Sequence, residues 1–247
     1  MRINRRRFLE VSTGAAALFS AQAGMRGEIK IASQGKRECV LLDLEAQCCL
    51  GESFLGYGKI LANARVVSTG SFPKSIIGCP TVIVPAAGMI DFAGTQYIKE
   101  SLRAGSLVLF ESGGGFLTSV EFARHQQLLE RHLKVVADSP VNLWAGEIKH
   151  GSNRRAGQQF SHNAVGNFPA PYIDYNWPIK AKVRDFSRVV PLAEQYGEVI
   201  GVMGKLPIAL RKRVGKGTLV FLGSPIGPHL HAGDSEAERW LKSVLAG

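Results

Sequence analysis

The chain has 247 residues, of which 45% are hydrophobic and 20% charged, with a formal net charge of +10 at pH 7. This composition excludes a globally disordered chain, and the length allows one large or two small domains. No apolar run reaches the roughly 18 residues that a membrane span needs. The basic residues form only short clusters, at 154–155 and 211–213, so we expect no nucleic-acid partner.

The first residues resemble an export signal. Residues 4–9 read N-R-R-R-F-L, which resembles the twin-arginine motif of two arginines, a variable residue and Phe-Leu. A mildly apolar stretch and a small-x-small cleavage site at 21–23 follow in the expected order. The resemblance implies a signal peptide over 1–23 and a mature domain over 24–247. The alternative is an amphipathic first helix with a basic start.

Removing this segment takes away four arginines and one glutamate, so the net charge falls from +10 to +7. The resemblance implies that the twin-arginine translocase and a signal peptidase act on the chain, and that it is periplasmic or otherwise exported in a bacterium. Cysteines in an oxidising compartment can form disulfides, although adjacent cysteines rarely pair with each other. With no C-x-x-C spacing, we expect buried thiols and leave the pairing open for Cys39, Cys48, Cys49 and Cys79.

Strands and helices alternate in the first half of the mature chain. Helices are predicted at 51–61, with Ser53 as a possible N-cap, at 91–104, between Asp91 and Gly105 as caps, and at 118–132. Short apolar runs predict buried strands at 38–44, 65–68, 78–85 and 106–110, with a fifth strand beginning at 133–136.

The middle of the chain, from 139 to 181, is polar and irregular in pattern. It contains Tyr172, Tyr175 and Trp177, which could stack on a sugar or peptide or simply pack the loop. We interpret it as an ordered excursion over the strand ends. Regular structure then returns, with antiparallel strands at 199–203 and 208–211, a tight turn at 215–217, a buried strand at 218–222, a loop at 223–228 and a last helix, capped by Asp234, that runs to 245.

This order predicts an α/β fold: a three-layer sandwich with a mainly parallel, flavodoxin-like sheet and a long inserted loop region, in a single domain. Functional groups in such folds gather at the carboxyl ends of the strands. The residues that we expect there are Glu45, Glu52, 85–89, 111–116 and 224–231.

Three segments resemble the class I glutamine amidotransferase-like superfamily. They are T-V-I-V-P-A-A-G at 81–88, the helix, glycine and strand ending in E-S-G-G-G at 97–115, and V-G-K-G-T-L-V-F-L-G-S-P-I-G at 214–227. The last is similar to non-catalytic branches, which include the biotin-protein-ligase N-terminal-like domains. The likeness covers about residues 37–135 and 197–246.

At the strand-to-helix turn, this chain differs from the active members of that superfamily. Those members place a cysteine there, later joined by His and Glu, whereas this turn reads F-E-S-G-G at 110–114. None of the four cysteines follows a suitable strand. We therefore expect no glutaminase activity.

Ser112 is the first candidate for other chemistry. A serine on a tight turn can present its hydroxyl, with the N–H groups of Gly113, Gly114 and Gly115 as an oxyanion hole or an anion site. Only half of a G-x-S-x-G elbow is present, and the base would be His229 or His231. The alternative is a glycine-rich turn in which Ser112 caps a helix.

Glu111 is the second candidate. It could act as a general base or bind a cation, with Glu52 facing it, or it could accept backbone N–H bonds that order the loops. His229 and His231 would share a face of a strand-like loop and could hold a metal with Glu111 or Asp234. Histidines in such a loop more often pack or face solvent, so we predict no metal and no cofactor.

The leading hypothesis is an exported amidotransferase-like domain without thiol chemistry. It would bind a small polar ligand or a protein partner at the strand ends, through Glu52, Gly88, Ser224 and the glycines at 113–115. The alternatives are a serine-dependent hydrolase that uses Ser112, and a structural domain whose own aromatic side chains fill the pocket.

Overall fold

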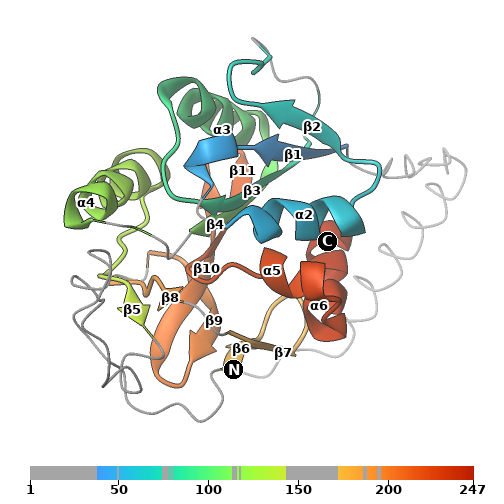
Figure 1. Cartoon of the computed structure of the whole chain (residues 1–247), viewed down its shortest axis with the longest axis vertical. Helices are drawn as coiled ribbons and strands as arrows, with labels where there is room; N and C mark the ends of the chain where they lie inside the picture. Colours follow the sequence, from blue (N-terminus) through green and yellow to red (C-terminus); the bar gives the residue numbers. More distant parts are fainter. Residues whose placement is uncertain are drawn as a thin grey trace, which may run out of the picture. The chain divides into compact units, whose positions relative to one another are not determined.

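A nine-stranded sheet runs through the chain in the order β2-β1-β3-β4-β11-β10-β9-β6-β7 (Figure 1). Its first five strands are parallel: β2 (Arg65–Ser68), β1 (Cys39–Asp43), β3 (Thr81–Ala87), β4 (Leu107–Ser112) and β11 (Gly217–Leu222). The remaining strands continue it in antiparallel pairs: β10 (Leu206–Val214), β9 (Glu198–Met203), β6 (Tyr172–Tyr175) and β7 (Ala181–Arg184). The separate pair β5 (Val141–Asn142) and β8 (Arg188–Val189) is antiparallel.

The computed structural model describes residues 38–48, 50–73, 78, 80–112, 116, 118–142, 172–185, 188–193 and 196–247. The predicted signal peptide, Cys49, Cys79, Gly113–Gly115 and most of the predicted excursion lie outside these residues. None of the described helices is long and apolar enough to cross a membrane.

Helices cover both faces of the sheet. They are α2 (Gly51–Ile60), α3 (Phe92–Ala104), α4 (Ser119–Leu128), which continues as the π-helix η2 (Leu129–Leu133), α5 (Gly227–Ala232) and α6 (Ser235–Ala246), with a 3-10 turn η1 (Glu45–Gln47) after β1. The predicted caps of α3 and α6 are confirmed, because the Asp91 carboxylate accepts a hydrogen bond from Gly94 N at 2.7 Å, Gly105 has φ 108° and Asp234 accepts from Glu236 N at 2.8 Å.

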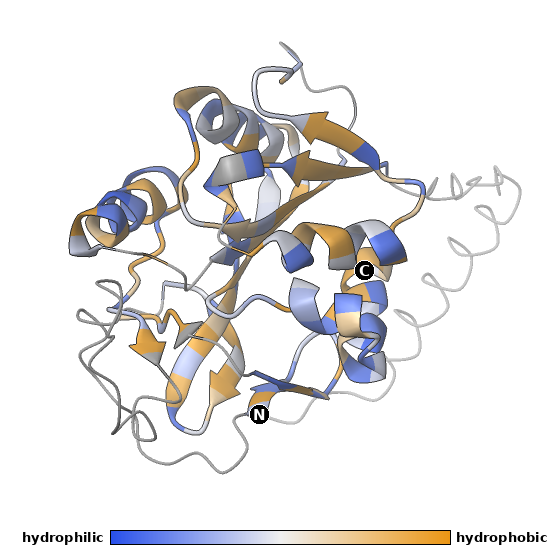
Figure 2. Ribbon diagram, in the orientation of Figure 1, coloured by the Kyte–Doolittle hydropathy of each residue, from blue (hydrophilic) through white to orange (hydrophobic). Residues whose placement is uncertain are grey.

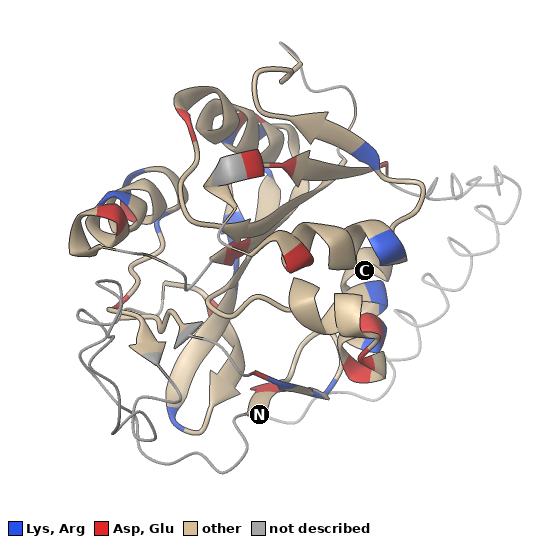
Figure 3. Cartoon of the chain, in the orientation of Figure 1, with Lys and Arg blue, Asp and Glu red and all other residues tan. Residues whose placement is uncertain are grey.

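Two apolar cores lie on opposite faces of the sheet because successive strand residues point to opposite sides. On one face, Val40, Val108 and Phe221 pack with the buried side chains of α3, α4 and η2. On the other, Leu41 and Leu109 pack with those of α2, α5 and α6. The central strands are accordingly apolar on both faces (Figure 2), and the charged residues lie mainly on the helices and at strand ends (Figure 3). The predicted three-layer α/β architecture is confirmed.

Several details differ from the sequence-based expectation. The sheet is mixed rather than mainly parallel, since β10, β9, β6 and β7 extend its parallel core with antiparallel pairs. The expected fifth strand at 133–136 is wrong: Leu133 ends η2 and Lys134 follows in a left-handed conformation with φ 56°. The expected excursion also ends earlier, because β6 and β7 are strands of the main sheet. The loop at 223–228 is shorter than expected, since α5 begins at Gly227.

Candidate functional site

The ends of β3, β4 and β11 lie side by side at one edge of the sheet, which we call the carboxyl edge. Register pairs Ala87 with Ser112 and Leu222 with Glu111. The chain therefore brings together the residues that follow these strands, as expected for parallel strands. Glu111, Ser112 and Ser224 are all buried at this edge.

The Glu111 side chain is completely buried and accepts five hydrogen bonds. Its Oε1 accepts from the Tyr57 hydroxyl at 2.6 Å and from the backbone N–H groups of Ile226 and Gly227 at 2.8 and 3.0 Å. Its Oε2 accepts from the Ser53 hydroxyl and from Ala86 N at 3.1 Å. One carboxylate at the end of β4 thus joins α2, β3 and the start of α5.

Burial raises the pKa of Glu111, and its hydrogen bonds from Ser53, Tyr57, Ala86 and Gly227 partly offset that rise. Burial, followed by the adjacent Glu111 carboxylate, raises the pKa of Tyr57 well above its usual value. Tyr57 therefore stays protonated and keeps its O–H as a donor. The acceptor positions of Glu111 are occupied by the protein itself, which matches the loop-ordering alternative for this residue.

The contact between α2 and α5 aims these donors at Glu111. A Cβ on Gly56 would lie 1.9 Å from the Gly227 carbonyl oxygen, and one on Gly227 would lie 2.1 Å from Ser53 Oγ. Only glycine permits this backbone approach. On the opposite side, Ala86 has φ 34°, a conformation that L-residues rarely adopt, and its N–H points at Glu111.

Ser112 contacts a histidine that the sequence reasoning did not select. Its Oγ lies 2.8 Å from His125 Nε2, and both side chains are buried. Burial lowers the pKa of His125 to about 4, and the nearby Gly88 backbone opposes that fall. His125 Nδ1 has no hydrogen-bond partner among the described residues, and Phe110 and Phe116 pack against the ring. The expected helix cap is not Ser112, because Thr118 caps α4.

A second polar contact lies beside the end of β11. The Ser224 hydroxyl donates to the Asp185 carboxylate, and both residues are buried. Burial lowers the pKa of His229, while Asp185 and Asp234 oppose that shift. Ser224 is thus held by a carboxylate that follows β7, far away in the sequence.

The other expected site residues take different places. Glu52 is exposed on α2, and its neighbour Ser53 contacts Glu111 from inside that helix, so the predicted N-cap role of Ser53 is wrong. Gly88 is buried and donates its N–H to the Gln47 carbonyl at 3.0 Å. The nearby Asp91 N–H donates to the Gln47 side chain at 2.9 Å.

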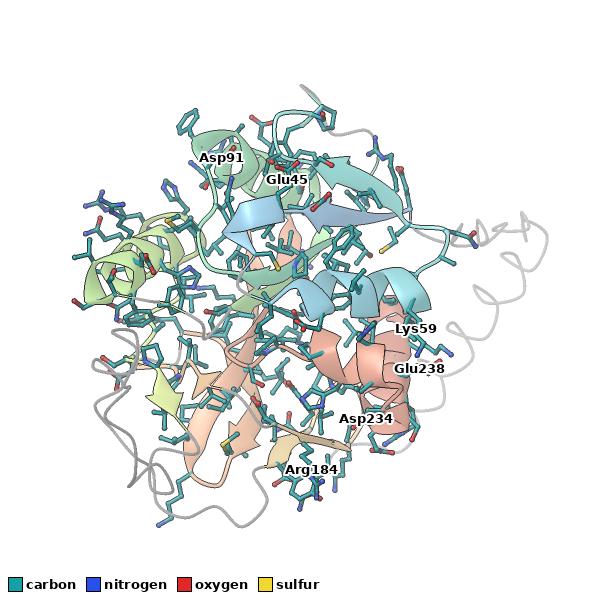
Figure 4. The ribbon with its side chains drawn as sticks, in the orientation of Figure 1. Glu45, Lys59, Asp91, Arg184, Asp234 and Glu238 are labelled. Atoms are coloured by element: carbon teal, nitrogen blue, oxygen red, sulfur yellow. The ribbon has the colours of Figure 1, made fainter. Side chains whose placement is uncertain are left out.

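The two histidines of α5 do not share a face. Positions two apart on a helix point about 200° apart, so the expectation of a strand-like loop is wrong for His229 and His231. His231 is exposed, and its carbonyl accepts a hydrogen bond from Lys59 Nζ of α2 at 3.3 Å, while Asp234 lies at the start of α6 (Figure 4). Within the described residues, no three His, Cys, Asp or Glu side chains form a group that could hold a metal.

The two described cysteines are free thiols. Burial and the neighbouring Glu38 raise the pKa of Cys39 to about 11. Cys48 lies near the carboxyl edge, where its Sγ–H donates to the Leu50 carbonyl at 3.1 Å. Burial also raises the pKa of Cys48, and the Glu111 charge adds to that rise. Both thiols are thus poor nucleophiles at neutral pH.

The spacing of residues along α2 and α4 indicates three site residues that were not predicted: Ser53 and Tyr57 as contacts of Glu111, and His125 as a contact of Ser112. Ser53 and Tyr57 are four residues apart on α2 and so share a face. His125 follows Phe122 by three residues and precedes Leu129 by four, which places it on the buried face of α4.

Comparisons with known proteins give a likeness in structure only. No protein-family model matches the chain, and no curated protein resembles it in sequence. The cytoplasmic protein STM1381 from Salmonella typhimurium LT2 superposes with a TM-score of 0.54 at 11% identity, over 85% of this chain and 98% of that one.

Two larger glycosidases contain a similar region. The exo-β-1,4-mannosidase Op5Man5 from Opitutaceae bacterium strain TAV5 gives a TM-score of 0.55 at 10% identity, over 84% of this chain and 36% of that one. Gan42B, a GH42 β-galactosidase from G. stearothermophilus, gives 0.50 at 13% identity, over 98% and 34%. This chain therefore spans about a third of their length. The likeness shows the fold alone, an α/β domain with a mixed sheet and a parallel core.

Proposed function

We propose that the chain is an exported, non-catalytic amidotransferase-like domain that binds a protein partner or a small polar ligand at the carboxyl edge. Its relation to the biotin-protein-ligase N-terminal-like branch is part of this proposal, carried by the sequence resemblance at 214–227. Export rests on the twin-arginine-like motif and the cleavage site at 21–23.

The observation that carries the proposal is the saturation of Glu111. Five donors occupy a carboxylate that has no exposed surface, so it is not presented as a base or a cation ligand. A general base has to lie within hydrogen-bond reach of the proton that it takes. The thiols of Cys39 and Cys48 are held protonated, which removes them as a substitute for the family's nucleophile.

Exposed apolar side chains next to this edge favour a partner. Met89 follows β3 and is 44% exposed, Phe92 begins α3 and is 78% exposed, and Val120 in the first turn of α4 is 59% exposed. Each belongs to the connection or helix that leaves a strand end. Large apolar side chains that gather on one side of a protein mark interaction surfaces more often than scattered ones do.

Site-specific crosslinking in cells tests the proposal. A photoreactive phenylalanine analogue would replace Val120 in the full chain, and the matched control would replace Tyr196, which is 62% exposed. Tyr196 precedes β9, which runs parallel to β11, so it lies near the opposite edge. We expect a discrete adduct from position 120 and none of the same size from position 196. Adducts of the same size from both positions would overturn the proposal. So would the absence of any adduct if the purified protein also retains no small molecule.

The Ser112–His125 contact favours one alternative function, a serine-dependent hydrolase. Its 2.8 Å separation is the distance expected between a nucleophile and its base. Against it stands the burial of both groups, which leaves neither side chain exposed to a substrate.

A fluorophosphonate probe decides between the two functions. A hydrolase would be labelled at Ser112, would lose the label in Ser112→Ala and His125→Gln, and would keep it in the control His229→Gln. We expect no labelling of the wild-type protein. Labelling that follows this pattern would replace the binding proposal with the hydrolase.

A further inference from the structure

A groove lies between α3 and the helix formed by α4 and η2. It has a volume of about 270 Å³. We call it the α3–α4 groove, and its lining consists of Ile90, Phe92 and Thr95 on one side and Arg124, Gln127, Leu128, Arg131 and His132 on the other. It begins beside the carboxyl edge, because Ile90 and Phe92 come directly after the end of β3.

The groove combines an apolar floor with a basic wall. Ile90 and Leu128 are partly buried against the core, and Phe92 stands beside them with 78% of its surface exposed. Among the described residues, neither Arg124 nor Arg131 has an ion-pair or hydrogen-bond partner, and both are exposed. The lining residues that the structure describes include no aspartate or glutamate. Unpaired guanidinium groups beside an apolar surface are suited to a carboxylate that accompanies an apolar side chain.

The surroundings of the groove add positive charge. Partial burial lowers the pKa of His132, and the charges of Lys99, Arg131 and Lys134 lower it further. These three charges come from α3, η2 and the residue after η2, so they surround the imidazole from more than one element. Carboxylates also lie next to the lining in sequence, at Asp91, Glu121 and Glu130, but the described lining itself carries two arginines and no carboxylate, a charge that attracts anionic partners.

We infer that the α3–α4 groove binds an acidic segment of a partner protein, with an apolar side chain against Ile90, Phe92 and Leu128 and carboxylates on Arg124 and Arg131. This inference rests on the proposed binding function and identifies its surface and partner chemistry. A second copy of the chain is a poorer occupant because it carries the same positive net charge, +10 for the whole chain and +7 without residues 1–23. A flat anionic membrane fits less well than a peptide, because the site is a concavity between two helices.

Fluorescence anisotropy with the full chain tests this inference. The probes are four fluorescein-labelled peptides in which one Phe or Leu stands among Asp and Glu at different spacings. Matched peptides carry Lys for the acids or Ala for the apolar residue. The groove variants are the double variant Arg124→Glu/Arg131→Glu and Phe92→Ala. The control Lys205→Glu/Lys216→Glu changes two exposed turn residues and shifts the net charge equally.

We expect at least one acidic probe to bind wild type and the control double variant alike, and to lose about tenfold or more in affinity on the groove double variant. Phe92→Ala should weaken the same probe, and the Lys and Ala peptides should not bind. The inference is overturned if no acidic probe binds, or if both double variants lose the same amount of affinity for the probe. It is also overturned if the groove substitutions change only self-association or the binding of anionic phosphatidylglycerol vesicles. Thermal unfolding of each variant excludes loss of the fold.

These results separate the groove from the wider function. Suppose that position 120 gives a crosslink but the affinity for the acidic probe is unchanged when Arg124 and Arg131 are replaced. The groove inference is then refuted, while the proposed function still holds. Absence of both the crosslink and retained ligand refutes the proposed function itself.

Discussion

Replacing Glu111 should destabilise the protein far more than its single charge suggests. In Glu111→Ala, five buried donors lose their acceptor at once: the hydroxyls of Ser53 and Tyr57 and three backbone N–H groups. Each unsatisfied buried donor costs about 1–3 kcal/mol, although water that enters the vacated space recovers part of it. We therefore expect a loss of at least about 3 kcal/mol, a large share of a typical domain's stability.

The isosteric variant Glu111→Gln gives a finer test. Its carbonyl oxygen would take the Oε1 position, where three donors converge, including Tyr57. Its amide NH₂ would then face the Ser53 hydroxyl, which can accept, and Ala86 N–H, which cannot. One orphaned backbone donor predicts a loss of about 1–3 kcal/mol, smaller than for alanine.

Urea unfolding followed by tryptophan fluorescence measures these differences. Glu52→Ala is the matched control, since Glu52 is exposed on the neighbouring helix and its loss should cost about 0.5 kcal/mol or less. The reasoning is refuted if Glu111→Ala unfolds at the same urea concentration as wild type, or if Glu111→Gln costs as much as Glu111→Ala. Either result would mean that the five contacts do not hold the carboxyl edge together.

Three further predictions concern the helix contact, pH and export. Gly56→Ala should lower stability by about 1–3 kcal/mol or more, because its methyl group would meet the backbone of α5. The control Gly58→Ala lies on the same helix, and its methyl group would meet nothing within 4 Å, so it should be neutral or stabilising. Thermal unfolding of the two variants measures the difference. Burial holds the pKa of His125 at about 4, below the roughly 6.5 of an unfolded histidine. The neutral imidazole therefore contributes stability above pH 6.5, and up to about 3 kcal/mol of it is lost as the pH falls through 4. The difference in unfolding free energy between wild type and His125→Gln, measured at a series of pH values, should show this slope. Replacing Arg5 and Arg6 together with Lys should leave an unprocessed precursor in the cytoplasm, and normal fractionation into the periplasm would contradict the export proposal.

The parallel half of the fold could be predicted from the sequence because its signals are local. Apolar runs indicate the strands, and Asp91 and Gly105 bound α3 as expected. The fifth strand was misassigned because Leu133 and Val135 are apolar and both buried, which suits a helix end that turns through Lys134 as well as a strand. β6 was missed because Y-I-D-Y lies in a polar context and joins the main sheet through β9, which is distant in sequence.

The positions of the site residues could be predicted from the sequence, but their hydrogen-bond partners could not. Glu111 and Ser112 follow from the strand end, where parallel folds gather polar groups. The donors to Glu111 lie 25 to 116 residues away, and nothing local connects them. Asp185, which meets Ser224 across 39 residues, likewise depends on the antiparallel extension of the sheet.

The Glu111 network also bears on where a partner can bind. In parallel α/β folds a ligand usually sits in the crevice at the strand ends, among free backbone N–H groups and polar side chains. Here the N–H groups of Ala86, Ile226 and Gly227 all point at one buried carboxylate, so these donors are already used within the chain. A partner therefore has to bind outside them, on the connections that leave the edge. Phe92 and Arg124 lie on such helices, and this is the physical reason to seek the binding surface in the α3–α4 groove.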